Sequence, residues 1–192
     1  MKHLAALVFC LLTPVICHAD PRTEVQGAFE QVLAAGGFRG FAQGQVFGSE
    51  LPAMAGDVDV LLPDRIHAST ENLEFIAIGE RAWISTLGVW AAVDRSMVPV
   101  TAFDIAAMRR AIGSIRDVQL EGTAKARQCA SHVYRFHASG NLPGAPSSGD
   151  LKVWICENGG KPARLEASNA TTHEKVVFDF DWSRRPSVRA PE

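Results

Sequence analysis

The sequence lacks the patterns by which common catalytic and metal sites are recognised. It contains no CxxC, HExxH, GxSxG, P-loop or GxGxxG pattern. Structural zinc sites usually take four clustered Cys or His ligands, and the histidines here are not spaced as ligands on one helix face. Asp57 and Asp59 share one face of a strand, but such a pair is more often a solvated edge than two-carboxylate chemistry. We therefore expect no enzyme, no metal site and no cofactor.

An excess of charge of one sign is also absent. The chain has 19 basic and 21 acidic residues and a formal net charge of -2. Without a clustered basic run, this balance argues against nucleic-acid binding and against purely electrostatic membrane docking. Three arginines near the C-terminus, Arg184, Arg185 and Arg189, form only a thin basic stretch together with Pro186 and Pro191. We expect residues 184–192 to be a flexible, solvated tail.

No apolar run is long enough to cross a membrane, which takes roughly 20 residues. The run from Leu4 to Ile16 follows a short positive start that contains Lys2, and the triplet ending at Ala19 suits signal peptidase. We expect residues 1–19 to be a signal peptide cleaved after Ala19, and the mature chain to be periplasmic without a transmembrane segment. Acylation of Cys17 is the alternative, but lipoprotein processing requires a small residue where Ile16 stands.

Cysteine is scarce in the mature chain. Of the four cysteines, Cys10 and Cys17 leave with the signal peptide, so Cys129 and Cys156 remain. Two cysteines in an oxidising compartment are normally paired. Each of the two lies in or beside a strand-like run, which predicts a cross-strand disulfide between them.

Two segments show helical periodicity. The first has Thr23 as its cap, ends at Gly36–Gly37, and places on one face Val25, Ala28, Phe29, Val32 and Leu33. The second opens at Thr101, has Asp104 as a box-like cap and ends at Gly113–Ser114. Its apolar face consists of Ile105, Met108 and Ile112.

The remaining patterns are those of β-strands, and they determine the fold class. Strands are predicted at residues 38–47, 57–62, 73–78, 81–86, 89–93, 118–125, 130–137, 151–156, 163–168 and 175–182. The stretch 139–149, rich in Gly, Pro and Ser, is predicted to be a mobile loop. The order of helix, strands, helix and strands predicts a single α+β domain over residues 20–183, an antiparallel meander with two helices on one face.

Several short stretches resemble the LolA-like superfamily, which includes lipoprotein carriers and LppX/LprG-type periplasmic lipid-binding proteins. They are residues 33–40, 63–67, 75–79, Trp83, 88–90, 132–136 and 152–156. The resemblance implies a strongly curved antiparallel sheet, a half-open β-barrel, with two or more helices covering its concave face. In that family the cavity takes acyl chains or hydrophobic polypeptide segments.

The expected ligand-binding residues are bulky apolar side chains on this concave face. They are Phe75, Ile78, Trp83, Trp90, Ile105, Met108, Ile112, Phe178, Phe180 and Trp182. A domain of this size also needs such residues for its core, so each is a candidate for either role. The flexible thioether of Met108 suits a helix that acts as a lid over variable apolar ligands.

Two functions follow from these expectations. The first is a periplasmic carrier that binds a hydrophobic ligand such as a lipid or lipoprotein acyl chain. The alternative is an envelope sensor or inhibitor that binds a protein on the same scaffold, with an enzyme as a distant third. A carrier requires an inward face free of unpaired charge, whereas a protein-binding module requires an exposed apolar patch with a polar rim.

Overall fold

The structure, a computed structural model, describes residues 20–44, 54–98, 104–127, 129–145, 149–168 and 175–191. Its helices are α1 (Pro21–Ala34), the 3₁₀ helix η1 (Arg95–Met97) and α2 (Ile105–Gly113). Its strands are β1 (Gly37–Gly44), β2 (Met54–Leu61), β3 (Arg65–Thr70), β4 (Leu73–Ile78), β5 (Arg81–Thr86), β6 (Val89–Val93), β7 (Arg116–Ala126), β8 (Cys129–Ala138), β9 (Gly149–Cys156), β10 (Pro162–Ser168) and β11 (Lys175–Phe180).

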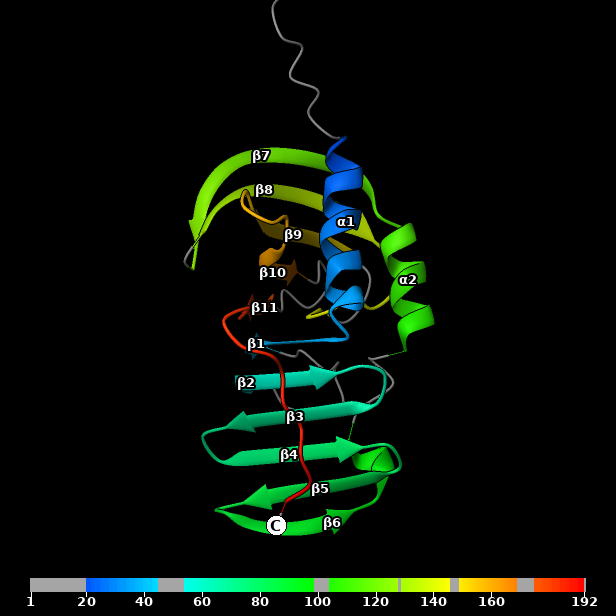
Figure 1. The fold of residues 1–192 in the computed structure, drawn as a ribbon, viewed down its shortest axis with the longest axis vertical. Coiled ribbons are helices and arrows are strands. Elements are labelled where there is room, and N and C mark those ends of the chain that lie inside the picture. Colours follow the sequence, from blue (N-terminus) through cyan, green and yellow to red (C-terminus); the bar gives the residue numbers. More distant parts are fainter. Residues whose placement is uncertain are drawn as a thin grey trace, which may run out of the picture.

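All the described strands form one antiparallel sheet in the order β6-β5-β4-β3-β2-β1-β11-β10-β9-β8-β7. Two meanders, β1–β6 and β7–β11, are joined where β1 pairs with β11, with Gly40 opposite Phe180. The sheet curves strongly, and its end strands β6 and β7 do not pair with each other (Figure 1). The predicted α+β fold with a half-open barrel is therefore confirmed.

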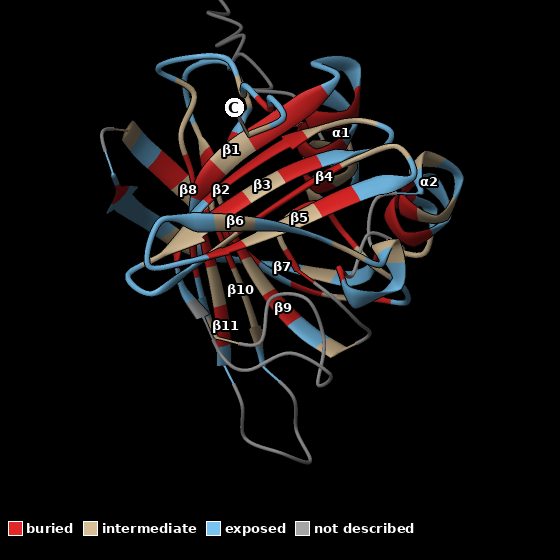
Figure 2. Ribbon diagram, turned by 90° about the horizontal axis from the view of Figure 1, so that it is seen from below, coloured by how far each residue is buried: buried red, intermediate tan, exposed pale blue. Residues whose placement is uncertain are grey.

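Both predicted helices form. The predicted apolar face of α1 is buried throughout, whereas in α2 Ile105 is only partly buried. In α1 the buried residues are Val25, Ala28, Phe29, Val32 and Leu33. In α2, Met108 and Ile112 are buried. α1 contacts β1, β7 and β9, and α2 packs against α1. Figure 2 shows both helices with their buried residues turned toward the sheet.

The helix starts differ from the prediction. Asp20, not Thr23, is the N-cap of α1, and the Thr23 hydroxyl donates to Asp20 Oδ2 at 3.3 Å. Pro21 is the first residue of the helix. Proline is tolerated there because the backbone N–H that it lacks would have no partner within the helix. Asp104 is the N-cap of α2, and its carboxylate accepts a hydrogen bond from Ala106 N at 2.8 Å. Thr101 lies outside the described residues.

Strand β3 was not predicted from the sequence. It pairs with β2 and β4 and buries Ile66 and Ala68, while Arg65 is exposed. Its side chains are small or polar apart from Ile66, so the strand carries a weak β-propensity signal. The predicted strand at 175–182 is longer than β11, which ends at Phe180. Of the predicted strand at 38–47, residues 38–44 lie in β1 and residues 45–47 lie outside the described part of the chain.

The predicted mobile loop at 139–149 is partly packed. Leu142 and Ala145 form an isolated β-bridge, and both are buried. Gly144 has a φ of +86° and lies so close to the Phe178 ring that an added Cβ would come within 2.9 Å of it. Glycine is therefore required here both for its backbone conformation and for its lack of a side chain. Residues 146–148 of the predicted loop are outside the described residues.

The C-terminal segment lies across the sheet instead of projecting into solvent (Figure 1). The Ser187 backbone N–H donates to Asp59 Oδ1 at 3.3 Å, and Val188 is buried. The solvated tail expected from the prolines and arginines is thus anchored at two points. Neither α1 nor α2, the α-helices of the described ranges, is long and apolar enough to cross a membrane. The predicted signal peptide lies outside the described residues.

Candidate functional site

The concave face of the sheet is filled by side chains in this structure. The rings of Phe38 and Phe178 are 5.5 Å apart, and those of Phe178 and Phe180 are 4.8 Å apart, measured between centroids. Met108 and Ile112 of α2 are buried in the same cluster, as is Phe75. Ile105 is only partly buried. The structure thus brings together most of the predicted concave residues, as a packed core.

Three of the predicted cavity residues lie on the other face of the sheet. On β4 and β5, Phe75 pairs with Ile84. Phe75 belongs to the core cluster, and Ile84 packs against it. Trp83 is the next residue along β5, so its side chain points to the opposite face. By the same alternation, Ile78 and Trp90 also point away from the core. The prediction that these three line the concave face is therefore wrong.

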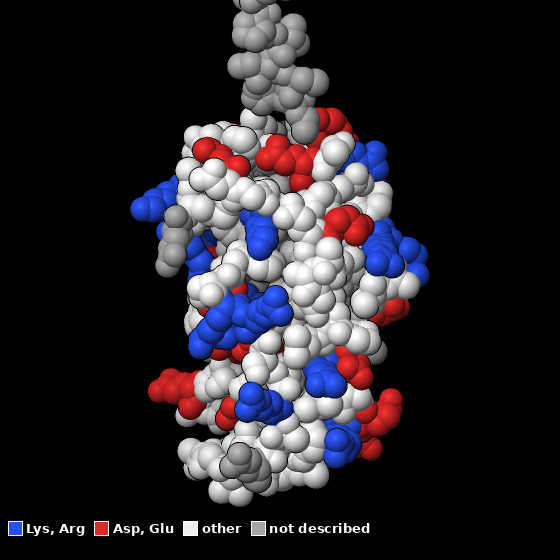
Figure 3. Space-filling view, viewed as in Figure 1, with Lys and Arg blue, Asp and Glu red and all other residues white. Residues whose placement is uncertain are grey.

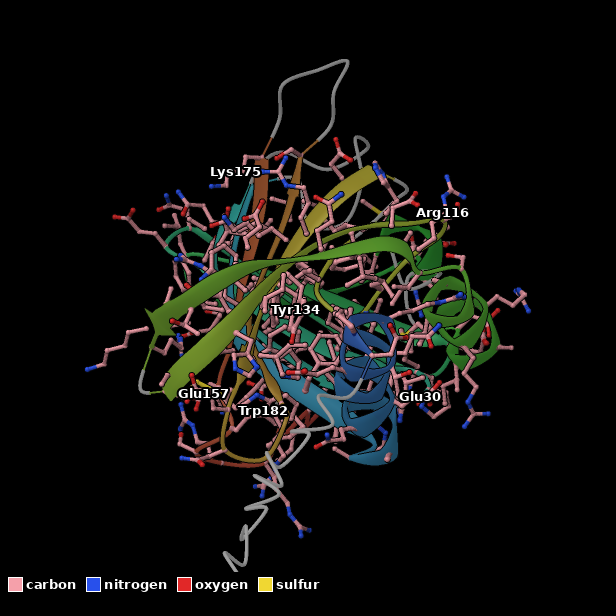
Figure 4. The ribbon with its side chains drawn as sticks, turned by 90° about the horizontal axis from the view of Figure 1, so that it is seen from above. Glu30, Arg116, Tyr134, Glu157, Lys175 and Trp182 are labelled. Carbon is pink, nitrogen blue, oxygen red and sulfur yellow. A yellow bond between two sulfur atoms is a disulfide. The ribbon has the colours of Figure 1, made fainter. Side chains whose placement is uncertain are left out.

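A half-open pocket of about 320 Å³ lies at the end of the sheet where β8 begins and β11 ends. It is lined by Ala126, Arg127, Cys129, Cys156, Ala163, Phe180, Asp181, Trp182 and Ser183. The predicted residues Phe180 and Trp182 are therefore pocket residues as well as neighbours of the core. In Figure 4, Trp182 and Glu157 mark this end of the molecule, and Lys175 marks the opposite end.

Two aromatic rings form the apolar wall of the pocket. Phe180 and Trp182 are stacked, with centroids 5.8 Å apart and an interplanar angle of 4°. Because the alternation of β11 continues past its last residue, the two side chains point the same way. The indole N–H of Trp182 donates to Pro162 O at 2.7 Å, which fixes the ring. Lys161 Nζ lies 5.0 Å from the centroid of the same ring, at cation–π distance.

The polar wall is built around Asp181. Its Oδ1 accepts hydrogen bonds from the Ser183 backbone N–H at 2.9 Å and from the Ser183 hydroxyl at 2.6 Å. These bonds, with smaller contributions from Arg39 and Arg127, hold the pKa of Asp181 below its ordinary value. Arg39 Nε lies 3.4 Å from Asp181 Oδ2, and its Nη1 lies 3.5 Å from Asp59 Oδ1. Asp181 is therefore a charged, well-partnered carboxylate at neutral pH.

The disulfide predicted from the sequence closes one side of the pocket. It joins Cys129 at the start of β8 to Cys156 at the end of β9, with 5.6 Å between their Cα atoms. Those two strands are neighbours in the sheet, with Ser131 opposite Cys156. The bridge therefore ties together the two strand ends that border the pocket.

A partly buried polar triad, Glu24, His132 and Tyr134, fastens α1 to the second meander. The Tyr134 hydroxyl donates to Glu24 Oε2 at 2.7 Å, and His132 Nδ1 lies 3.1 Å from Glu24 Oε1. Burial and then the bond to Glu24 raise the pKa of Tyr134, so the phenol stays a neutral donor. In Figure 4, Tyr134 lies beside α1 over the middle of the molecule. The contact positions the helix and leaves no free acid–base group there.

The sequence raised two further kinds of chemical site, a metal centre and the Asp57–Asp59 carboxylate pair. No cluster of three or more His, Cys, Asp or Glu side chains suited to a metal ion occurs among the described residues. Of the two aspartates on β2, Asp57 is exposed, whereas Asp59 is bound by Arg39 and by the backbone of Ser187. Asp59 therefore has a structural role, holding the C-terminal segment on the sheet.

Comparison with known proteins bears on this arrangement. No protein-family profile and no curated protein sequence matches the chain. Among solved structures, the lipoprotein LppX of Mycobacterium tuberculosis matches with a TM-score of 0.62 and 12% identity over 88% of this chain and 98% of LppX. LprF from Mycobacterium bovis matches with a TM-score of 0.59 and 10% identity over 89% of this chain and 96% of LprF. The chain shares the fold of LppX and LprF. At such low identity the likeness shows the fold alone.

Several residues that line the pocket were not predicted from the sequence. They are Ala126, Arg127, Ala163, Asp181 and Ser183. Each is small or polar, and none stands out by type or spacing. The one signal in the sequence that could have located the pocket is the predicted disulfide, because it implies that the strand ends at Cys129 and Cys156 lie side by side.

Proposed function

We propose that this protein is an exported, non-enzymatic carrier that binds a hydrophobic ligand, such as a lipid or lipoprotein acyl chain, in the pocket beside the disulfide. The pocket carries the proposal, because its volume of about 320 Å³ lies within the range of small-molecule sites. Its wall of Phe180 and Trp182 continues into the aromatic core.

Binding of an environment-sensitive fluorescent fatty acid tests this proposal. We expect saturable binding in the micromolar range, which corresponds to about 8 kcal/mol. Trp182→Ala removes half of the stacked wall and should weaken binding roughly tenfold or more, because burying an aromatic side chain is worth about 1.5–3 kcal/mol. Trp90→Ala is the matched control, since Trp90 lies on the other face of the sheet. Absence of saturable binding at any probe concentration would contradict the carrier function.

Export is tested separately by the intact mass of the protein recovered from the envelope. The apolar run ending at Ile16 and the Cys17-His18-Ala19 triplet lead us to expect a chain that begins at Asp20 and carries no lipid. A mass that retains Lys2 would contradict cleavage. A mass increased by an acyl group on Cys17 would instead make the protein a membrane-anchored lipoprotein.

Protein binding in the envelope is the second candidate function, and one feature favours it. The β5–β6 hairpin carries Leu87 and Val89, whose exposed fractions are 89% and 73%. Leu87 also adopts a positive φ of 54°, which costs energy in a residue other than glycine. Two exposed apolar residues beside an edge strand form the kind of patch that binds partners. If the wild-type protein does not bind the fluorescent fatty acid, protein binding becomes the better-supported function.

A further inference from the structure

Positive side chains surround the mouth of the pocket. Arg127 lines it. Lys161 lies over the Trp182 ring, with its ammonium 5.0 Å from the ring centroid. Arg184 is exposed and directly follows the lining residue Ser183, so their Cα atoms are about 3.8 Å apart. Figure 3 shows a block of basic atoms at the level of β11 and β1, where the C-terminal segment leaves the sheet.

Two described carboxylates, Asp181 and Glu157, lie near the mouth, and each has a neighbouring polar partner. Asp181 accepts two hydrogen bonds from Ser183 and faces the Arg39 guanidinium. Glu157 directly follows Cys156, and its Oε1 lies 4.0 Å from His132 Nε2. Arg39 is shared between Asp181 and Asp59, so it does not by itself cancel the charge of Asp181. The three cations Arg127, Lys161 and Arg184 nevertheless outnumber the two carboxylates beside the opening, Asp181 and Glu157. The mouth is therefore electropositive beside an apolar wall.

We propose that the pocket selects a single-chain amphiphile with an anionic head, placing the head on Arg127 and Lys161 and the alkyl chain along Phe180, Trp182 and the disulfide. This inference rests on the proposed carrier function and names its ligand class. A guanidinium binds a carboxylate or phosphate through two parallel hydrogen bonds, and an ammonium adds a point charge. An alkyl chain gains from contact with the two rings in proportion to the apolar area it buries.

The same arrangement discriminates against other heads. A cationic head would be repelled by Arg127, and the face of Trp182 that could hold it by cation–π attraction already carries Lys161. A neutral alcohol would keep the chain contacts and lose the charge-assisted bonds, which are roughly twice as strong as neutral hydrogen bonds. The pocket therefore discriminates between ligands by the charge of the head.

Four amphiphiles with the same twelve-carbon chain test the inference by displacement of the fluorescent probe. Laurate and dodecyl phosphate should bind about tenfold tighter than dodecanol, and dodecyltrimethylammonium should bind weakest. The preference should shrink when salt is raised from about 0.05 M to about 0.5 M, because exposed charges are then screened. Dodecyl phosphate that binds more tightly than laurate, with both tighter than dodecanol, would assign a phosphate head to the single-chain ligand in place of a carboxylate head.

Two double variants separate the pocket charges from general charge effects. R127A/K161A should bring laurate down to the affinity of dodecanol while leaving dodecanol unchanged. R109A/R116A removes the same charge from α2 and from the start of β7, and should preserve the preference. In Figure 4, Arg116 lies far from Trp182. Equal wild-type affinities for laurate and dodecanol would overturn this inference while the carrier function stands, whereas failure of all four amphiphiles to bind would overturn both.

Discussion

Met108→Glu is expected to unfold the domain at room temperature. Met108 is 1% exposed and belongs to the core cluster between α2 and the sheet. A carboxylate placed there has no described partner for its charge, and an uncompensated buried charge costs about 3–5 kcal/mol or more. The lost packing of the thioether adds to that cost. Natural domains have a total stability of only about 5–15 kcal/mol, so this loss takes most or all of it.

Circular dichroism and thermal unfolding measure the effect of Met108→Glu. Met97→Glu is the matched control, because Met97 is 58% exposed and its replacement should change the free energy of unfolding by less than about 0.5 kcal/mol. Met108→Leu, which keeps the volume and the apolar character, should cost under about 1.5 kcal/mol. A folded Met108→Glu protein with an unchanged melting temperature would show that α2 covers an open cavity and not a closed core.

The sequence predicted the fold well where side-chain periodicity was strong. In β11, Val176, Phe178 and Phe180 alternate with Val177 and Asp179, and the structure buries the first set. The apolar face of α1 was predicted in the same way. In such segments the spacing of the apolar residues matches the period of the helix or strand, so a single sequence suffices to predict which face is buried. The order of these elements then indicated the α+β class, and the layout of short motifs indicated a half-open, strongly curved sheet.

Periodicity did not reveal which face of β5 points to the core. Either Ala82 with Ile84 or Trp83 with Ser85 could be the buried set, and the larger aromatic suggested the second. The structure buries Ala82 in the core, and Trp83 lies on the other face with the Arg81 guanidinium 5.5 Å from its ring centroid. Ala77 and Ala82 pair directly across β4 and β5 and both are buried, so the core side carries small residues here. A choice based on the size of the side chain therefore selected the wrong face.

The pocket could not be predicted because its lining comes from distant parts of the chain. Arg127 precedes β8, Ala163 belongs to β10, and Ser183 follows β11. They come together because β8, β9, β10 and β11 pair consecutively in the second meander, which places their ends side by side. Local patterns contain no direct information on such a pairing. The disulfide was the exception, since counting cysteines after signal-peptide cleavage left one possible pair.

Replacing Cys129 and Cys156 together by Ser is expected to lower the free energy of unfolding by about 3–4 kcal/mol without abolishing the fold. The bridge spans a sequence separation of 27 residues, and in the chain-entropy model closing a loop of that length restricts the unfolded chain by this amount. The native pairing of β8 with β9 remains, because it extends from Ser131 to Ala138 along the strands. Denaturant unfolding measures the difference. The wild type treated with reductant is the control, and it should reproduce the loss.

The double replacement also tests whether the bridge shapes the pocket. Both cysteines line it, so relaxation of the ends of β8 and β9 should weaken binding of the fluorescent fatty acid even where the domain stays folded. A thiol assay on denatured, unreduced wild-type protein must first find no free thiol in the mature chain. Two free thiols per chain would contradict the bridge, and a double variant as stable as the wild type would show that strand pairing alone holds this end of the sheet.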